Sequence, residues 1–149
     1  MSSKQVFSMA GERPTFEEDG VTDVEVIVTK AQSEGRYSIM KSRWLSTFEV
    51  PPHCHKTHSE TFYVLDGQVE WIVEGETRVL NAGDALYVPP NIVHSVRVLG
   101  GKDSHNILIY EPGGYEEQTD NKMNYTVEEL ETSEIKDRIR RMSDFFVVE

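Results

Sequence analysis

Three histidines and one glutamate have the types and the spacing of a site for a divalent metal. His53, His55 and Glu60 lie in the stretch PPHCHKTHSETFYVLDG, and His94 ends the later stretch GDALYVPPNIVH. Imidazole nitrogens and carboxylate oxygens are ligands of divalent transition metals. On a β-strand, side chains two positions apart project from the same face, so His53 and His55 can bind one ion together. Glu60 follows far enough along the chain to begin a neighbouring strand that returns alongside, and His94 must approach from elsewhere in the fold.

Four such side chains converging inside a barrel would leave a first-row metal with open positions for water, dioxygen or substrate. We therefore expect chemistry at this site and not a purely structural ion. The ligand set suits iron, manganese, nickel, copper and zinc alike, so we expect one divalent transition metal per chain without choosing among these five.

The two stretches resemble the paired motifs of the cupins. The first cupin motif reads G-x5-H-x-H-x3,4-E-x6-G, and here it runs from His53 to Gly67 with four residues between the second histidine and the glutamate. The second reads G-x5-P-x-G-x2-H-x3-N, and here it runs from Gly83 through Pro89 to His94. Three positions that do not bind metal in the family depart from the motifs, namely Thr47, Asn91 and Val98.

This resemblance implies an all-β fold, a double-stranded β-helix or jelly-roll cupin barrel, followed by a C-terminal α-helical tail. It also implies His53, His55, Glu60 and His94 as the metal ligands, with Glu60 acting in addition as a catalytic base toward the substrate. The residues around the first motif are most similar to those of small single-domain bacterial cupins of the quercetin-dioxygenase-like group. That group implies a dioxygenase acting on a small enol or phenolic, flavonol-like compound.

Two other functions stay open, because one barrel hosts many chemistries. With a redox-silent metal, the same site would support a non-redox isomerase, decarboxylase or cyclase acting on a sugar or a polyketide. The third reading is a small-ligand-binding cupin without turnover.

The middle of the chain has the pattern of a barrel. Short apolar stretches, each ended by glycine or proline, predict the strands of a barrel core over residues 24–111. Trp71 and Val73 alternate with polar residues, as in a half-buried strand. Asp66-Gly67 has the form of a two-residue hairpin turn. Asn91 stands where the family has glycine, and because asparagine tolerates left-handed backbone conformations, we expect it to serve in a turn.

The flanks differ in kind from the core within what we expect to be a single domain over residues 1–149. Residues 1–23 are expected to form an N-terminal arm, and residues 112–149 a loop and a C-terminal helix. Thr126-x-x-Glu129 has the form of a capping box, and the apolar repeat from Ile135 to Met142 predicts an amphipathic helix. Residues 145–148 are all apolar, so we expect them to dock on the barrel or on a second subunit.

Inward-facing side chains near the ligands are the candidates for a substrate pocket. Apolar residues at strand period are usually core, but the same residues would form the pocket wall if the barrel has room for a substrate. A loop histidine between the ligands is either an exposed residue or a proton shuttle at the pocket mouth. The candidates are Phe62, Val64, Trp71, Val73, Val96 and His58.

Composition narrows the partners and the compartment. The formal charge of −11 disfavours nucleic acid and anionic membranes, both of which need basic patches. No 18-residue apolar run or apolar leader is present, which disfavours membrane spanning and secretion. Cys54 is the single cysteine, so no intrachain disulfide can form, as is typical of a reducing cytoplasm. Small cupins often exchange terminal strands, so the resemblance adds the expectation of a cytoplasmic homodimer with a small-molecule substrate.

Overall fold

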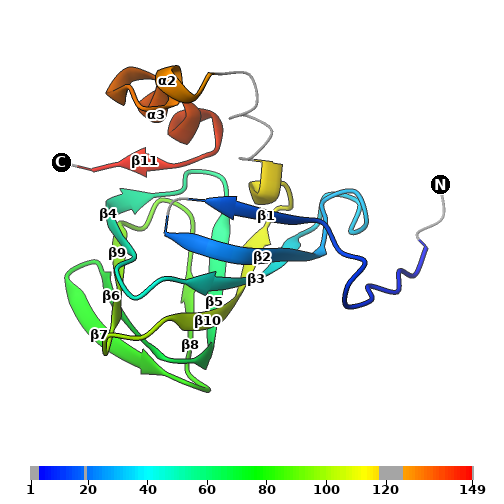
Figure 1. Ribbon diagram of the computed structural model, residues 1–149, viewed down its shortest axis with the longest axis horizontal. Helices are drawn as coiled ribbons and strands as arrows, with labels where there is room; N and C mark the ends of the chain where they lie inside the picture. Colours follow the sequence, from blue (N-terminus) through cyan, green and yellow to red (C-terminus); the bar gives the residue numbers. More distant parts are fainter. Residues whose placement is uncertain (1–3, 19, 118–125, 149) are drawn as a thin grey trace.

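The chain folds into two antiparallel sheets with an apolar core between them (Figure 1). A computed structural model describes residues 4–18, 20–117 and 126–148. The six-stranded sheet has the order β1-β2-β3-β10-β5-β8, and the five-stranded sheet has the order β11-β4-β9-β6-β7. The strands are β1 (Thr15–Glu18), β2 (Val21–Val28), β3 (Ser38–Trp44), β4 (Glu49–Cys54), β5 (Ser59–Asp66), β6 (Gln68–Val73), β7 (Glu76–Asn81), β8 (Ala85–Val88), β9 (His94–Leu99), β10 (Ser104–Glu111) and β11 (Phe146–Val147).

Alternation along the strands builds this core. In β3 and β10 every second residue is buried, as expected for strands with one face on the interior. Trp44 from one sheet stacks on Phe62 with ring centroids 5.0 Å apart, and Phe62 meets Trp71 of the other sheet at 4.9 Å. These aromatic contacts join the two sheets, and the predicted all-β jelly-roll class is confirmed.

The strands that carry the ligands lie in opposite sheets. β4 pairs with β9 in the five-stranded sheet, whereas β5 pairs with β8 and β10 in the six-stranded sheet. The expectation that the strand bearing Glu60 returns alongside the strand bearing His53 is therefore wrong. The loop over residues 55–58 crosses from one sheet to the other, so the ligands approach the site from two sides of the core.

The hairpin expected at Asp66-Gly67 is also wrong. β5 and β6 do not pair with each other, and the chain changes sheets at Gly67. Gly67 has φ +95°, and a Cβ there would lie 2.9 Å from the Cα of Ser104. The glycine thus serves a crossover packed against a neighbouring backbone. By contrast, Asn91 has φ +67°, as its expected place in a turn requires.

The flanks supply β1, the start of β2, β11 and the cover of one barrel end. β1 and β2 join the six-stranded sheet, so the boundary expected at residue 23 falls inside β2; Phe16 and Val21 pack on the core there. A short 3-10 helix, η1, covers Tyr115–Glu117, and the part of the expected loop over residues 118–125 lies outside the described residues.

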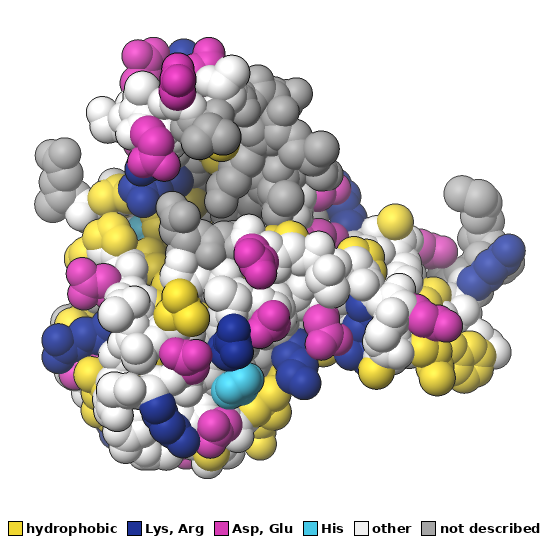
Figure 2. Space-filling model, viewed as in Figure 1, with side chains coloured by type: hydrophobic (Ala, Val, Ile, Leu, Met, Phe, Trp, Pro, Cys, Tyr) yellow, Lys and Arg dark blue, Asp and Glu magenta, His cyan; other side chains and the backbone are white. Residues whose placement is uncertain are grey.

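On the face that Figure 2 shows, acidic and basic side chains are interspersed.

The C-terminal tail is helical and then extended. Thr126 and Glu129 form the predicted capping box at the start of α2 (Val127–Leu130), and α3 (Ser133–Met142) follows. Ile139 is buried, whereas Met142 at the end of the predicted apolar stripe is 58% exposed. β11 then pairs with β4, so the apolar tail docks on the barrel of its own chain. None of the helices in the described part of the chain is long and apolar enough to cross a membrane. The homodimer and the cytoplasmic location stay predictions.

We predict that Gly67→Ala lowers the free energy of unfolding by about 2–4 kcal/mol, because both the left-handed backbone and the contact with Ser104 oppose a side chain. Gly75→Ala is the matched control, since Gly75 has φ +81° with open space around it and should cost only about 1 kcal/mol. Urea denaturation of the three proteins measures the difference. Equal losses in the two variants would show that the close approach to Ser104 contributes nothing.

Candidate metal centre

Three buried imidazoles meet at one end of the barrel. His53 on β4 is paired across the ladder with His94, the first residue of β9, and His55 follows directly after β4 ends. One ring nitrogen from each histidine lies within 4.8 Å of the others. All three side chains are at most 4% exposed, so the cluster is closed off from bulk water.

Each ring is held in one orientation by a backbone carbonyl. The Nδ1 atoms of His53, His55 and His94 lie 2.8 Å from the carbonyl oxygens of Pro51, Asp144 and Ile92, respectively. Because a carbonyl oxygen can only accept a hydrogen bond, each Nδ1 carries a proton. In the neutral ring, the lone pair then belongs to Nε2, the atom that a metal requires.

Glu60 enters the cluster from the opposite sheet. It lies near the start of β5 and is 4% exposed. Its Oε2 is 3.2 Å from Nε2 of His55 and 3.5 Å from Nε2 of His94. The hydroxyl of Tyr110 donates a hydrogen bond to Oε1 at 3.3 Å. The carboxylate is thus placed against the same nitrogens that would bind an ion.

The charges in the cluster are set by burial and by these contacts. For Glu60, burial raises the pKa, but the hydrogen bond from His55 and the nearby ring of His94 outweigh it and hold the pKa well below its usual range. For His53, burial and the nearby His94 lower the pKa to about 3. Burial also acts against the charged form of His55, yet its bond to Glu60 raises the pKa of that ring above the usual value. At neutral pH without an ion, Glu60 is therefore a carboxylate and His53 a neutral ring, whereas the contact with Glu60 favours the protonated form of His55, whose Nε2 proton a metal would displace.

The residues fit a divalent ion. Nε2 of His94 is buried and has no hydrogen-bond partner among the described residues, although it faces the cluster. A buried nitrogen with a free lone pair is costly unless something binds it. A cation at the convergence of the three Nε2 atoms would satisfy it, and Glu60 offers the negative charge that a divalent ion prefers.

Asp144, which lies between α3 and β11, fastens the loop that carries His55. One carboxylate oxygen accepts the backbone N–H of Lys56 at 2.8 Å, and the other accepts those of Thr57 and His58 at 2.9 Å. The second oxygen also accepts a hydrogen bond from Nδ1 of His58 at 2.7 Å. The main-chain oxygen of the same residue holds His55. Four donors therefore fix one aspartate, which in turn orients a ligand.

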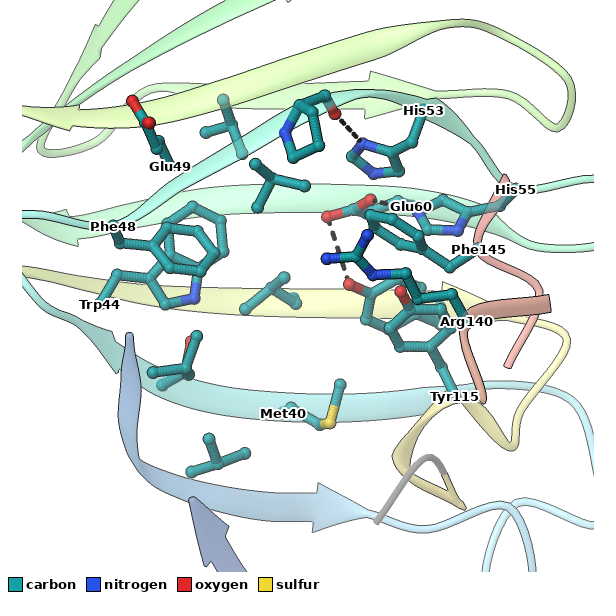
Figure 3. Close-up of a pocket in the computed structure, with 18 of the residues that line it drawn as sticks. Met40, Trp44, Phe48, Glu49, His53, His55, Glu60, Tyr115, Arg140 and Phe145 are labelled. Atoms are coloured by element: carbon teal, nitrogen blue, oxygen red, sulfur yellow. Dashed lines mark hydrogen bonds and ion pairs between the residues drawn. The ribbon is translucent and has the colours of Figure 1, made fainter. Parts of the chain in front are cut away.

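A cavity of about 450 Å³ opens beside the cluster (Figure 3). His53, His55 and Glu60 line one end of it, where Phe145 stacks on His53 with ring centroids 4.1 Å apart. The rest of the wall comes from inward side chains of both sheets, from η1 and from the C-terminal tail. The apolar part includes Val24, Met40, Trp44, Phe48, Val50 and Leu108.

The expected pocket residues divide into two groups. Trp71 and Val96 line the cavity. Phe62 and Val64 are fully buried in the core, farther along β5 than Glu60, and are not among the lining residues. Val73 is partly buried against the core, and the side chain of His58 pairs with that of Asp144 beside the cavity.

The sequence did not single out several residues that complete the site. Tyr110, Arg140 and Asp144 come from β10, α3 and the segment before β11, and none of them lies in a motif. Phe145 had a signal, since the apolar end of the chain was expected to dock. The others are brought to the site by contacts between distant parts of the chain, which spacing along the sequence does not report.

Comparisons with known proteins agree with this fold and site. Residues 46–118 match the family described as "Cupin domain". The chain therefore contains a cupin domain, as its two motifs predict. The solved structure of KdgF from Halomonas sp. has a TM-score of 0.64 at 24% identity, over 74% of this chain and 98% of that chain. At this identity the likeness shows a shared fold.

Two relatives are similar in sequence to parts of the chain. A quercetin 2,3-dioxygenase of Bacillus subtilis is 35% identical over 80 residues, which are 54% of this chain and 23% of that protein. The pectin degradation protein KdgF of Dickeya dadantii is 42% identical over 45 residues, which are 30% of this chain and 41% of that protein. The similarity thus spans less than half the length of either relative.

We predict that Asp144→Asn weakens metal binding about tenfold, the usual effect of removing a residue that orients a ligand. An amide has one acceptor oxygen, and its NH2 group would face backbone N–H donors of the loop that carries His55. Chelator competition with zinc measures the affinity. Asp137→Asn on the exposed side of α3 is the control, because Asp137 pairs with Arg141 at the surface, away from the metal centre. Equal affinities in the two variants would contradict a role for Asp144 at the metal centre.

We also predict a pH dependence of stability in the metal-free protein. Since the folded-state pKa of His53 is about 3 and its usual value is near 6.5, the unfolded chain binds a proton between these pH values that the folded chain does not. The free energy of unfolding therefore falls as the pH falls from 6.5 toward 3, by up to about 1.4 kcal/mol per pH unit from this group. Urea denaturation at several pH values measures the free energy of unfolding, which should change less per pH unit in His53→Gln than in the unchanged protein. Identical slopes would refute the assignment.

Proposed function

We propose that this protein is a metal-dependent cupin enzyme, with dioxygenase activity on a small enol or phenolic, flavonol-like compound. One observation carries the proposal: three imidazole rings have nitrogens within 4.8 Å of one another, and the carboxylate of Glu60 lies 3.2 Å from Nε2 of His55, beside a largely apolar cavity. An ion bound to protein ligands on one side and open to a cavity on the other can be reached by a substrate in that cavity. The partial likeness to a quercetin 2,3-dioxygenase supports this reading.

The chain would hold one divalent transition metal through His53, His55 and His94, with Glu60 as the fourth ligand. When bound, iron, manganese, nickel or copper would supply redox chemistry with dioxygen, and zinc would supply Lewis acidity.

Glu60 is placed to move a proton. Its carboxylate lies at the cavity wall, where an oxygen can accept the proton of an enol or phenol hydroxyl that enters the cavity. The hydroxyl of Tyr110 on Oε1 fixes the plane of the carboxylate while this happens. Because the walls around Met40 and Trp44 are apolar, they exclude water from the deprotonated substrate.

A second candidate is a non-redox isomerase, decarboxylase or cyclase acting on a sugar or polyketide. The likeness of part of the chain to a pectin degradation protein favours it, and the proton transfer by Glu60 would serve it equally well. The redox and non-redox readings differ in whether dioxygen is consumed.

The test is dioxygen uptake by protein loaded separately with iron, manganese, nickel, copper or zinc, using flavonols and other enols as substrates. We predict that Glu60→Gln keeps its metal, because three histidines remain, and loses turnover by at least about a hundredfold, because the proton acceptor is gone. His55→Ala should lose most of both. Elemental analysis and an oxygen electrode measure the two quantities.

His105→Ala is the matched control, since His105 lies on β10 away from the cluster and should keep both metal and turnover. Full metal content in His55→Ala would refute the site. Substrate conversion without dioxygen uptake would support the non-redox alternative, and bound metal without any conversion would favour a ligand-binding barrel.

A further inference from the structure

One arginine at the cavity has no ionic partner in the described part of the chain. Arg140 lines the cavity from α3, on the same side as Glu60, and Figure 3 shows its guanidinium directed toward that end. Its Cζ lies 5.4 Å from the ring centroid of Phe145, which in turn stacks on His53. This cation–π contact holds the guanidinium beside the metal centre.

Apart from Glu49, which Figure 3 shows at the Phe48 side of the cavity and away from Arg140, the other charges that line the cavity are already matched. Lys136 pairs with Glu131 at 3.3 Å, and Glu60 is bonded by His55 and Tyr110. The neighbouring arginine on α3, Arg138, pairs with Glu134 at the surface. In a chain with 26 acidic and 15 basic residues, an arginine left without a carboxylate beside a cavity marks a place for an anion from outside.

The interior of the cavity adds a second requirement. Nε1 of Trp71 and Oγ of Ser42 are buried, line the cavity, and have no hydrogen-bond partner among the described residues. A buried donor needs an acceptor, so the body of the ligand carries an oxygen as well as apolar surface. The apolar wall of Met40, Trp44 and Phe48 fits a ring or an alkyl chain.

We propose that the cavity takes a hydroxylated organic acid, and that Arg140 binds its carboxylate and so determines specificity for acids. The assignment rests on the proposed function only in that this acid is the enzyme's substrate. Arg140 makes a charge-assisted, two-pronged hydrogen bond to the carboxylate beside the metal centre, while the body lies along the apolar wall. The enol or phenol hydroxyl of the same molecule then faces Glu60.

The test is the affinity for 3-(4-hydroxyphenyl)propanoate, hexanoate and cyclohexylacetate, each compared with its uncharged amide. Zinc-loaded and metal-free protein are titrated by calorimetry without dioxygen, so that no turnover is needed. Emission of Trp44 and Trp71, the two tryptophans of the chain and both in the cavity wall, reports whether a probe lies inside. We expect an acid to bind about tenfold or more tightly than its amide.

In Arg140→Gln this preference for the acid should disappear, with the affinity for the amide unchanged. Arg138→Gln is the matched control and should keep the preference, because Arg138 faces solvent on the same helix. The proposal is overturned if none of the acids binds, if acid and amide bind equally, or if the preference survives in Arg140→Gln, which would assign it to the metal. A protein that prefers acids but consumes no dioxygen would refute the dioxygenase reading and leave this inference intact.

Discussion

Three carbonyl oxygens that accept hydrogen bonds from histidine Nδ1 atoms are the constraint on which the metal centre depends. For His53 and His94 the carbonyl belongs to the residue two positions earlier, so each strand orients its own ligand. For His55 the carbonyl belongs to Asp144, 89 residues away. Two ligands are therefore set by local backbone geometry, and the third is set only when the C-terminal segment has docked. The four hydrogen bonds to the Asp144 carboxylate hold that segment against the loop. The orientation of His55 therefore depends on the docking of the tail.

Burial gives the cluster its electrostatic character. A carboxylate and three imidazoles are buried, where an unmatched charge or lone pair is expensive. The hydrogen bond to Glu60 favours the protonated form of His55, while burial and the nearby His94 keep His53 neutral. The arrangement is self-consistent without an ion, yet it leaves Nε2 of His94 unsatisfied. This balance, in which one bound cation replaces several imperfect contacts, is what separates a preformed metal centre from an ordinary buried polar cluster.

Much of the fold and the ligand set follows from the sequence because the signals are local. The interval between His53 and His55, the strand alternation around Trp71, the left-handed turn at Asn91 and the capping box at Thr126 depend on neighbours a few residues away. What spacing does not reveal is which sheet a strand joins. For that reason the sequence predicts a hairpin where the chain crosses between sheets at Gly67, and it predicts β5 as a partner of β4 although the two strands lie in different sheets. The same limit applies to Asp144 and Arg140, whose roles arise only from packing of the tail against the barrel end.

The division between the matched domain and the tail has a consequence for how such proteins diversify. The candidate ligands lie within residues 46–118, whereas Arg140 and Phe145, which line the same cavity, lie outside that stretch. Substitutions in α3 can therefore change the wall of the cavity without altering any of the four candidate ligands. Asp144 sets the boundary of this freedom, because it belongs to the tail and yet orients His55. The tail and the metal centre are thus joined at Asp144, and a replacement of the tail would have to restore the carbonyl that holds His55.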